Sequence, residues 1–128
     1  MEIFKIITLS LSSLLLFSVG AMRLLNPIKT YLKNSGIQLE NDVNILNEIR
    51  GLSSVMMFSG FMIMLGIFIS NLTLISFVVA ILIFIGFAIG RLISIGLDGK
   101  PNKLIIQGLI FEIIFGSLNI ICLVNSLM

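Results

Sequence analysis

Four long apolar runs, separated by polar segments, dominate the pattern of this chain. They cover about residues 6–25, 51–70, 74–97 and 104–126. Each run has about the twenty residues that an α-helix needs to cross the hydrocarbon of a bilayer. Lipid offers no hydrogen bonds to a bare backbone, so such spans are helical. The pattern predicts an all-α fold, a four-helix transmembrane bundle, with residues 1–128 forming a single integral membrane domain.

The first run also fits a second interpretation, a cleaved signal peptide. Lys5 precedes the apolar stretch, and Ser18, Val19 and Gly20 offer small residues at which a peptidase could cut. The apolar stretch is long for a signal peptide, and Glu2 cancels the charge of Lys5. A retained span is the main expectation, and cleavage stays open as the alternative.

The long polar segment, residues 26–50, contains signals for helix ends. Pro27 is placed to start a short helix, and Gly36 is placed to end it. Asn41 or Asp42 can serve as an N-cap, because each offers a side-chain oxygen to the free amides of a first turn. The second transmembrane helix is therefore expected to begin before the hydrocarbon.

Two shorter segments connect the later spans. Asn71 and Thr73 mark a tight connection between the second and third spans, which predicts an antiparallel hairpin. Residues 98–103 read DGKPNK and predict a turn, in which Gly99 supplies permissive backbone angles. Pro101 suits the first helical turn of the fourth span.

Positive charge is distributed unequally between the two ends of the predicted bundle. Lys5 lies alone at the end that carries the termini. The other seven of the eight basic residues lie near the long segment or the later turn: Arg23, Lys29, Lys33, Arg50, Arg91, Lys100 and Lys103. Because positively charged loops are retained in the cytoplasm, we expect a multi-pass protein of the bacterial plasma (inner) membrane. The segment 26–50 would be cytoplasmic and both termini outside.

Composition narrows the possible functions. With 58% hydrophobic and 11% charged residues, and a mean hydropathy of +1.19, the chain is far from the usage of soluble proteins. The net charge of +2 is small and scattered, so nucleic-acid binding is not expected. The sequence has no His and a single Cys, Cys122. We therefore expect no metal site, no cofactor and no catalytic residues, and an enzyme is the least favoured class.

The fourth span contains an acidic residue, Glu112, which is expensive in lipid at roughly 2.5 to 3.5 kcal/mol near a helix centre. It lies 11 residues after Pro101, which is about 16 Å along a helix and close to mid-bilayer. Gly108 and Gly116 are four residues to either side, and Asn119 is seven residues on. This small and polar face should point into the bundle.

Basic residues of the second and third spans are the expected partners of Glu112. Arg91 and Asp98 share one stripe of the third helix, and the third and fourth helices should be neighbours. Arg91 can therefore approach Glu112, and Arg50 can approach the same region. The predicted ligand-binding residues are Arg50, Arg91, Asp98, Glu112, Glu48 and Asn119. The alternatives are headgroup-level charges that only set topology and a buried carboxyl that only joins two helices.

Gly86 and Gly90 form a G-x-x-x-G pair in the third span. Such pairs allow close approach of helix backbones in membranes. Packing within one molecule is the first expectation, and a homo-oligomer through these glycines is the second.

Several of these features together resemble a known family. NEIRG leads into the second span, GRLISIGLDGKP closes the third, and a Glu lies in the middle of the fourth. This layout, which covers nearly the whole chain, is similar to the small bacterial four-helix membrane proteins of the domain of unknown function 4345 family. One departure is Leu52-Ser53-Ser54 after Arg50-Gly51, where an aromatic residue and a Gly are expected. The resemblance implies a compact membrane bundle and no known activity.

Two functions remain in competition. The leading hypothesis is a non-enzymatic bundle that binds a membrane lipid, a small ligand or a partner membrane protein at the Arg/Glu cluster. The alternative is a proton-coupled carrier or a subunit of a membrane transport complex, because a buried Glu beside an Arg can form part of a proton relay.

Overall fold

The computed structural model describes residues 2–128, and within these residues it contains helices and no strands. The elements are α1 (Ile3–Leu25), α2 (Pro27–Ser35), α3 (Val43–Phe68), the 3-10 turn η1 (Ser70–Leu72), α4 (Thr73–Asp98) and α5 (Lys103–Leu127). The four long helices are each long and apolar enough to cross a membrane. The predicted all-α, four-span bundle is confirmed, with α2 as a fifth, shorter helix.

The long segment between the first two spans has the predicted helix ends. Pro27 is the first residue of α2, and Gly36 ends that helix with a φ of 65°, a left-handed conformation that suits glycine. Asp42 is the N-cap of α3, and its side chain accepts a hydrogen bond of 3.1 Å from the backbone amide of Ile45. The second of the four long helices thus begins at Val43, well before its apolar run.

The turn between α4 and α5 differs from the prediction in one respect. Gly99 has a φ of 106°, as expected for a glycine turn. Pro101, however, lies before α5 and not in its first turn. Asn102 takes the N-cap position, and its side-chain oxygen accepts a hydrogen bond of 3.0 Å from the amide of Ile105. An Asn oxygen can satisfy an amide of the first turn, whereas a Pro cannot, so the cap falls one residue later.

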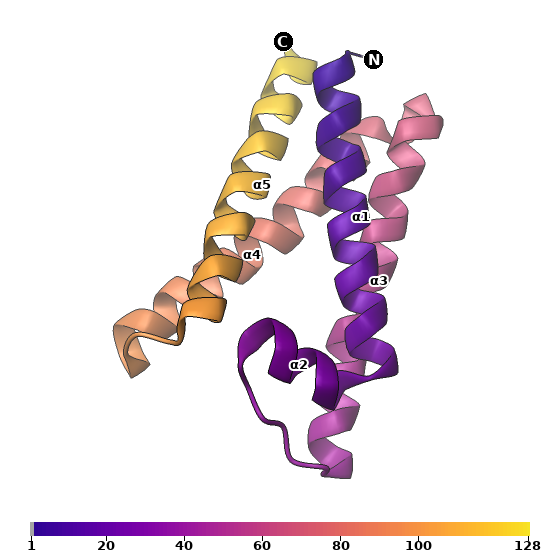
Figure 1. The fold of residues 1–128 in the computed structure, drawn as a ribbon. Helices are drawn as coiled ribbons and strands as arrows, with labels where there is room; N and C mark the ends of the chain where they lie inside the picture. Colours follow the sequence, from indigo (N-terminus) through magenta and orange to yellow (C-terminus); the bar gives the residue numbers. More distant parts are fainter. Residues whose placement is uncertain (1) are drawn as a thin grey trace.

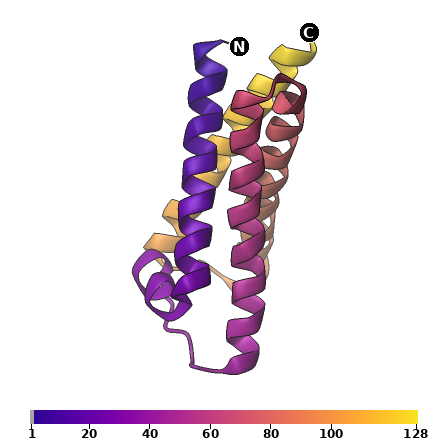
Figure 2. The ribbon, with the colours of Figure 1, turned by 90° about the vertical axis from the view of Figure 1, so that its right-hand side faces the viewer.

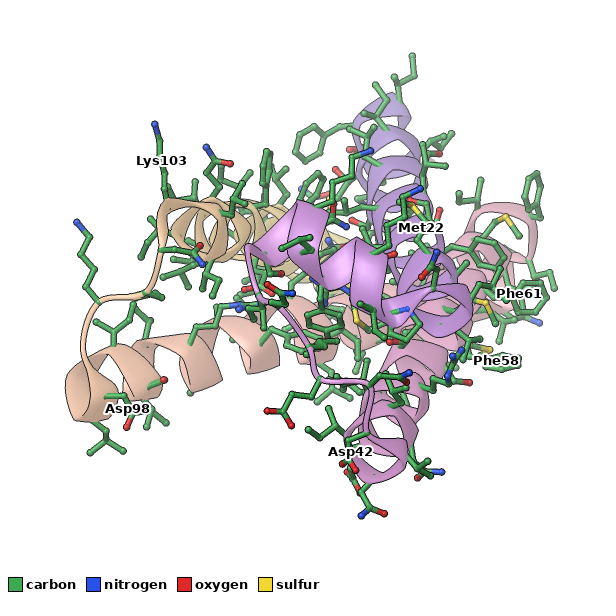
Figure 3. The ribbon with its side chains drawn as sticks, turned by 60° about the horizontal axis from the view of Figure 1, so that its bottom comes forward. Met22, Asp42, Phe58, Phe61, Asp98 and Lys103 are labelled. Carbon is green, nitrogen blue, oxygen red and sulfur yellow. The ribbon has the colours of Figure 1, made fainter. Side chains whose placement is uncertain are left out.

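The long helices form two closely packed pairs, α1 with α3 and α4 with α5, and η1 connects the pairs between α3 and α4 (Figure 1). Both termini lie at one end of the bundle, and α2 and the α4–α5 turn lie toward the other (Figures 1 and 2). The pairs diverge toward that second end. In Figure 3, Asp98 and Lys103 mark the far end of one pair, Asp42 marks the start of α3, and α2 lies between them.

Small residues bring α1 and α3 into backbone contact. A Cβ atom at Gly20 would lie 2.6 Å from the backbone nitrogen of Met57, and one at Gly60 would lie 2.5 Å from that of Phe17. Only glycine fits at such distances. In lipid, where apolar surfaces gain little by leaving the solvent, this tight packing is what holds helices together.

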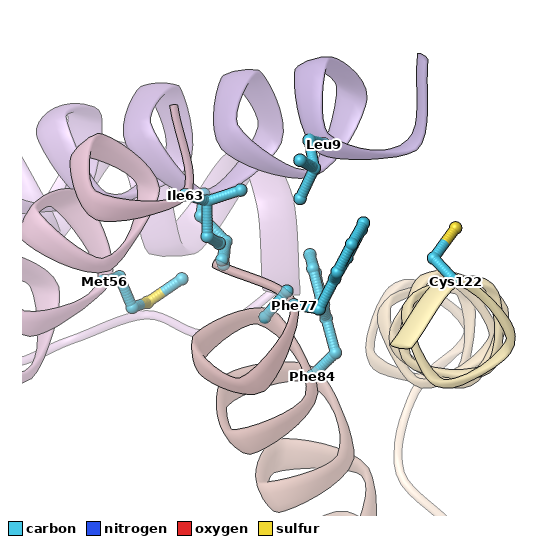
Figure 4. Close-up of a cluster of buried hydrophobic side chains, with 8 residues drawn as sticks. Leu9, Met56, Ile63, Phe77, Phe84 and Cys122 are labelled. Carbon is cyan, nitrogen blue, oxygen red and sulfur yellow. The ribbon is translucent and has the colours of Figure 1, made fainter. Parts of the chain in front are cut away.

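The apolar core lies where the two pairs converge (Figure 4). Phe77 and Phe84 of α4 project toward α1 and α5, and Phe84 stacks on Phe115 with ring centroids 5.4 Å apart. Outside the core the pattern is that of a lipid-facing protein, since large apolar side chains such as Leu14 and Leu82 are 66% and 69% exposed. The core therefore holds the two helix pairs together at the end where they converge. At the other end the pairs diverge, which leaves space between them for a binding site.

Candidate functional site

Arg91 of α4 and Glu112 of α5 form an ion pair inside the bundle. Arg91 Nε donates to Glu112 Oε1 at 2.7 Å. The two side chains are 27% and 13% exposed, so the pair is partly buried. The approach expected from the sequence is present, because the short turn after α4 places the two helices side by side. A charge-assisted hydrogen bond of this length is among the stronger polar contacts in proteins.

A second guanidinium, that of Arg23, lies near this pair and was not among the predicted site residues. It belongs to the last turn of α1 and is only 8% exposed. Its guanidinium lies 4.5 Å from the ring centroid of Tyr31, and Nη2 donates to Ser35 Oγ at 3.4 Å. Its Nε is buried and has no hydrogen-bond partner, and within residues 2–128 no carboxylate forms an ion pair with it.

The sequence did contain a signal for Arg23. Tyr31 and Ser35 are four residues apart on a short helix that starts immediately after the first span. Residues at this spacing share a helix face. An aromatic ring and a hydroxyl on that face can receive a guanidinium from the preceding span.

Two cavities meet at these charges. The first, here called the α5 cavity, has a volume of about 390 Å³ and is lined mainly by α1, α2, α4 and α5, with Glu112 and Lys33 in its wall. The second, the α4 cavity, has a volume of about 530 Å³ and is lined mainly by α4, with Tyr31 and Ser35 of α2 in its wall. Arg23, Phe87 and Arg91 line both. The two guanidiniums therefore stand at the border between the cavities.

Positive charge predominates around the cavities. Among the described residues of their walls, Glu112 is the single carboxylate, and it faces Arg23, Lys33 and Arg91. Because one carboxylate faces three cations and forms its ion pair with Arg91, the walls carry an excess of positive charge at Arg23 and Lys33. Residues 2–128 contain no group of three His, Cys, Asp or Glu placed to hold a metal ion. The arrangement can attract an anion by charge and hydrogen bonding.

Three charged residues among the predicted site residues lie outside both cavities. Glu48 and Arg50 are exposed in the first turns of α3, and Arg50 donates to the backbone oxygen of Leu24 at the end of α1. Asp98 is exposed at the end of α4, where it accepts a hydrogen bond of 3.0 Å from Ser94 Oγ. The structure does not bring these residues to Glu112, because α3 begins so early that Arg50 lies at the level of the end of α1.

Asn119 lies on the predicted inward face of α5 but has a different partner. It is fully buried, and its Nδ2 donates to Ser12 Oγ of α1 at 3.0 Å and to the backbone oxygen of Phe115 at 2.8 Å. Its Oδ1 has no partner among the described residues. Asn119 therefore joins α5 to α1 in the core and lines neither cavity.

Gly86 and Gly90 do not pack closely within the molecule. A Cβ atom at either position would have nothing within 4 Å. Both glycines are exposed and line the α4 cavity. The expected tight packing inside the monomer is wrong for this pair, because α1 and α3 approach each other through Gly20 and Gly60 instead.

Comparison with known proteins identifies a family. Residues 3–123 match the family described as Domain of unknown function (DUF4345), which covers nearly the whole chain. No curated protein and no solved structure matches the chain. The resemblance seen in the sequence is confirmed, and this chain belongs to the DUF4345 family.

Proposed function

We propose that this protein is a non-enzymatic membrane bundle that binds a small ligand or a lipid in the cavities at Arg23, Arg91 and Glu112. The observation that carries the proposal is the position of the Arg91–Glu112 pair and of Arg23 at the border of two cavities. Charged side chains within a membrane are costly, and they face a bundle interior or cavity where they serve a purpose.

The cavity sizes favour a small ligand over a partner helix. Volumes of about 390 and 530 Å³ fall in the usual range for sites that hold small molecules. One turn of a helix, 10 to 12 Å wide and 5.4 Å tall, would by itself occupy roughly 400 to 600 Å³. A partner helix has several turns, so a lipid or a small molecule is the better occupant of cavities of this size.

Native mass spectrometry of the protein released from membranes tests this function. We expect wild-type protein to retain a discrete additional mass and Arg91→Gln to lose it. Asp98→Asn is the matched control, because Asp98 lies in the same hairpin but outside both cavities. Absence of any bound mass in the wild type, or equal retention by Arg91→Gln, would contradict the proposal.

The charge distribution supports a finer placement in the cell, which we propose with the function. Seven of the eight basic residues lie toward the end that carries α2 and the α4–α5 turn. This bias fits a bacterial plasma membrane protein with that end in the cytoplasm and both termini outside. The cavities would then lie near the cytoplasmic leaflet.

A proton-coupled carrier, or a subunit of one, is the second candidate. It is favoured by one observation, the presence of Glu112 in a cavity wall in contact with Arg91. Four spans are few for a carrier, so this function would require several copies, joined for example through the exposed Gly86 and Gly90. A strictly monomeric protein in bilayers, without proton flux in proteoliposomes, would exclude it.

A further inference from the structure

We propose that the ligand is an anionic membrane lipid, whose phosphate group binds at Arg23 while an acyl chain occupies the α4 cavity. This inference rests on the proposed binding function and specifies its ligand.

The charge of Arg23 is the first reason. Its side chain is more than nine-tenths buried, its Nε has no partner, and no carboxylate of the described residues pairs with it. A buried cation that lacks an ion-pair partner and leaves an N–H unsatisfied is unfavourable. A phosphate group offers both the negative charge and the acceptor oxygens that such a guanidinium lacks.

The cavity walls also distinguish between lipid headgroups. A headgroup with a cationic end, such as choline, would meet Arg23, Lys33 and Arg91 in the wall of the α5 cavity. The single carboxylate there, Glu112, is already occupied by Arg91. Repulsion therefore disfavours a zwitterionic lipid, and a headgroup whose only charge is the phosphate fits best.

The α4 cavity provides a place for the chain and a route into it. Beyond the two guanidiniums its wall is mostly apolar and includes Leu52, Ile83 and Phe87. Leu82 and Gly86 of the same wall are exposed on the outer side of α4, so the cavity reaches the surface that faces lipid. An acyl chain can enter from the bilayer without leaving an apolar environment.

The depth of the site agrees with a lipid headgroup. Arg23 lies in the last turn of α1, and Lys33 lies exposed on α2 beyond it. Basic residues at the end of a membrane span lie at the boundary between hydrocarbon and headgroups. The phosphate would thus remain near its normal level in the leaflet while its chain lies between the helix pairs.

Thermal unfolding with lipid additions tests the inference. The protein has no Trp and one Tyr, but Cys122 is its only thiol and is 1% exposed. A dye that fluoresces on reaction with thiols therefore reports unfolding. Detergent-solubilised protein would be titrated with phosphatidylglycerol, with phosphatidylcholine of the same chains, and with inorganic phosphate. We expect phosphatidylglycerol to raise the unfolding temperature and the other two to act at least tenfold more weakly.

Variants locate the effect. Arg23→Gln should weaken the response to phosphatidylglycerol at least tenfold, and Lys33→Gln, on an exposed side chain that should not affect folding, should weaken it several-fold. Lys100→Gln is the matched control, because Lys100 is exposed at the same end and lines neither cavity. An unchanged response in both Arg23→Gln and Lys33→Gln would overturn the inference.

The probes separate this inference from the proposed function. Equal stabilisation by both lipids would refute the anionic class, and an equal effect of inorganic phosphate would refute the lipid, while either result leaves a binding function in place. If no probe stabilises the protein and no bound mass is found after purification, the proposed function fails as well.

Discussion

The Arg91–Glu112 pair predicts an unequal effect of removing each partner. Glu112→Gln leaves Arg23, Lys33 and Arg91 around the cavities without any carboxylate in the walls. Arg91→Gln leaves Glu112 with Arg23 in the wall of the same cavity, so part of its electrostatic stabilisation survives. We therefore expect Glu112→Gln to be the more destabilising change.

The expected magnitudes follow from burial. Breaking a well-buried pair commonly costs about 3 to 5 kcal/mol, and partial exposure lowers this value. Arg91 and Glu112 are 27% and 13% exposed, so breaking their pair should cost less than it would in a fully buried pair. We expect losses of about 2 to 4 kcal/mol for Glu112→Gln and about 1 to 3 kcal/mol for Arg91→Gln. The double variant should recover about 1 to 3 kcal/mol of the sum.

The assay is unfolding of the four proteins in detergent, followed through the thiol of Cys122. Wild type, both single variants and the double variant form a complete cycle, and Asp98→Asn serves as a control for a charge change outside the pair. Additive losses, with no recovery in the double variant, would show that the two residues do not interact. A larger loss for Arg91→Gln than for Glu112→Gln would refute the account of the surrounding positive charge.

Three further predictions concern packing, capping and topology. Gly60→Ala should lower stability in thermal unfolding, because its Cβ would lie 2.5 Å from the backbone of α1 and would push α1 away from α3. Gly51→Ala is the control: its Cβ would have nothing within 4 Å, so the change should be neutral or stabilising by up to about 1 kcal/mol. Asn102→Ala should lower the free energy of unfolding by about 1 kcal/mol more than Asp42→Ala does. The reason is that Asn102 caps α5 and also donates a hydrogen bond of 2.8 Å to the backbone oxygen of Ser35 in α2, whereas Asp42 only caps α3. Equal losses of stability would contradict this prediction. Alkaline phosphatase fused after Met128 should be active outside the cell and a fusion in segment 26–50 inactive, and the reverse pattern would overturn the orientation.

Local patterns made much of the fold predictable. The spans follow from the length of the apolar runs, and the cap at Asp42 follows from hydrogen bonds within a few residues. The contact between Arg91 and Glu112 was also predictable from the sequence, because a short turn places two consecutive helices side by side. In each case the interacting groups are close in sequence or belong to neighbouring elements.

The remaining features depend on how α1 docks against the rest. Ser12 and Asn119 are 107 positions apart, and nothing in either span alone specifies their contact. From the sequence, Arg23 could be only a basic residue that sets the orientation of the protein in the membrane. Its buried position follows from the way α2 packs against α1, which places Tyr31 and Ser35 beside its guanidinium. The divergence of the helix pairs, which creates the cavities, is likewise a property of tertiary packing.

The ion pair between α4 and α5 also bears on how the chain enters the membrane. Its two charges lie on consecutive helices joined by residues 99–102, so they can neutralise each other as soon as this hairpin has formed. Each charge alone would oppose insertion by roughly 2.5 to 3.5 kcal/mol at a helix centre. A hairpin that enters as one unit carries a neutral pair instead. Membrane integration of α5 is thus expected to be coupled to that of α4.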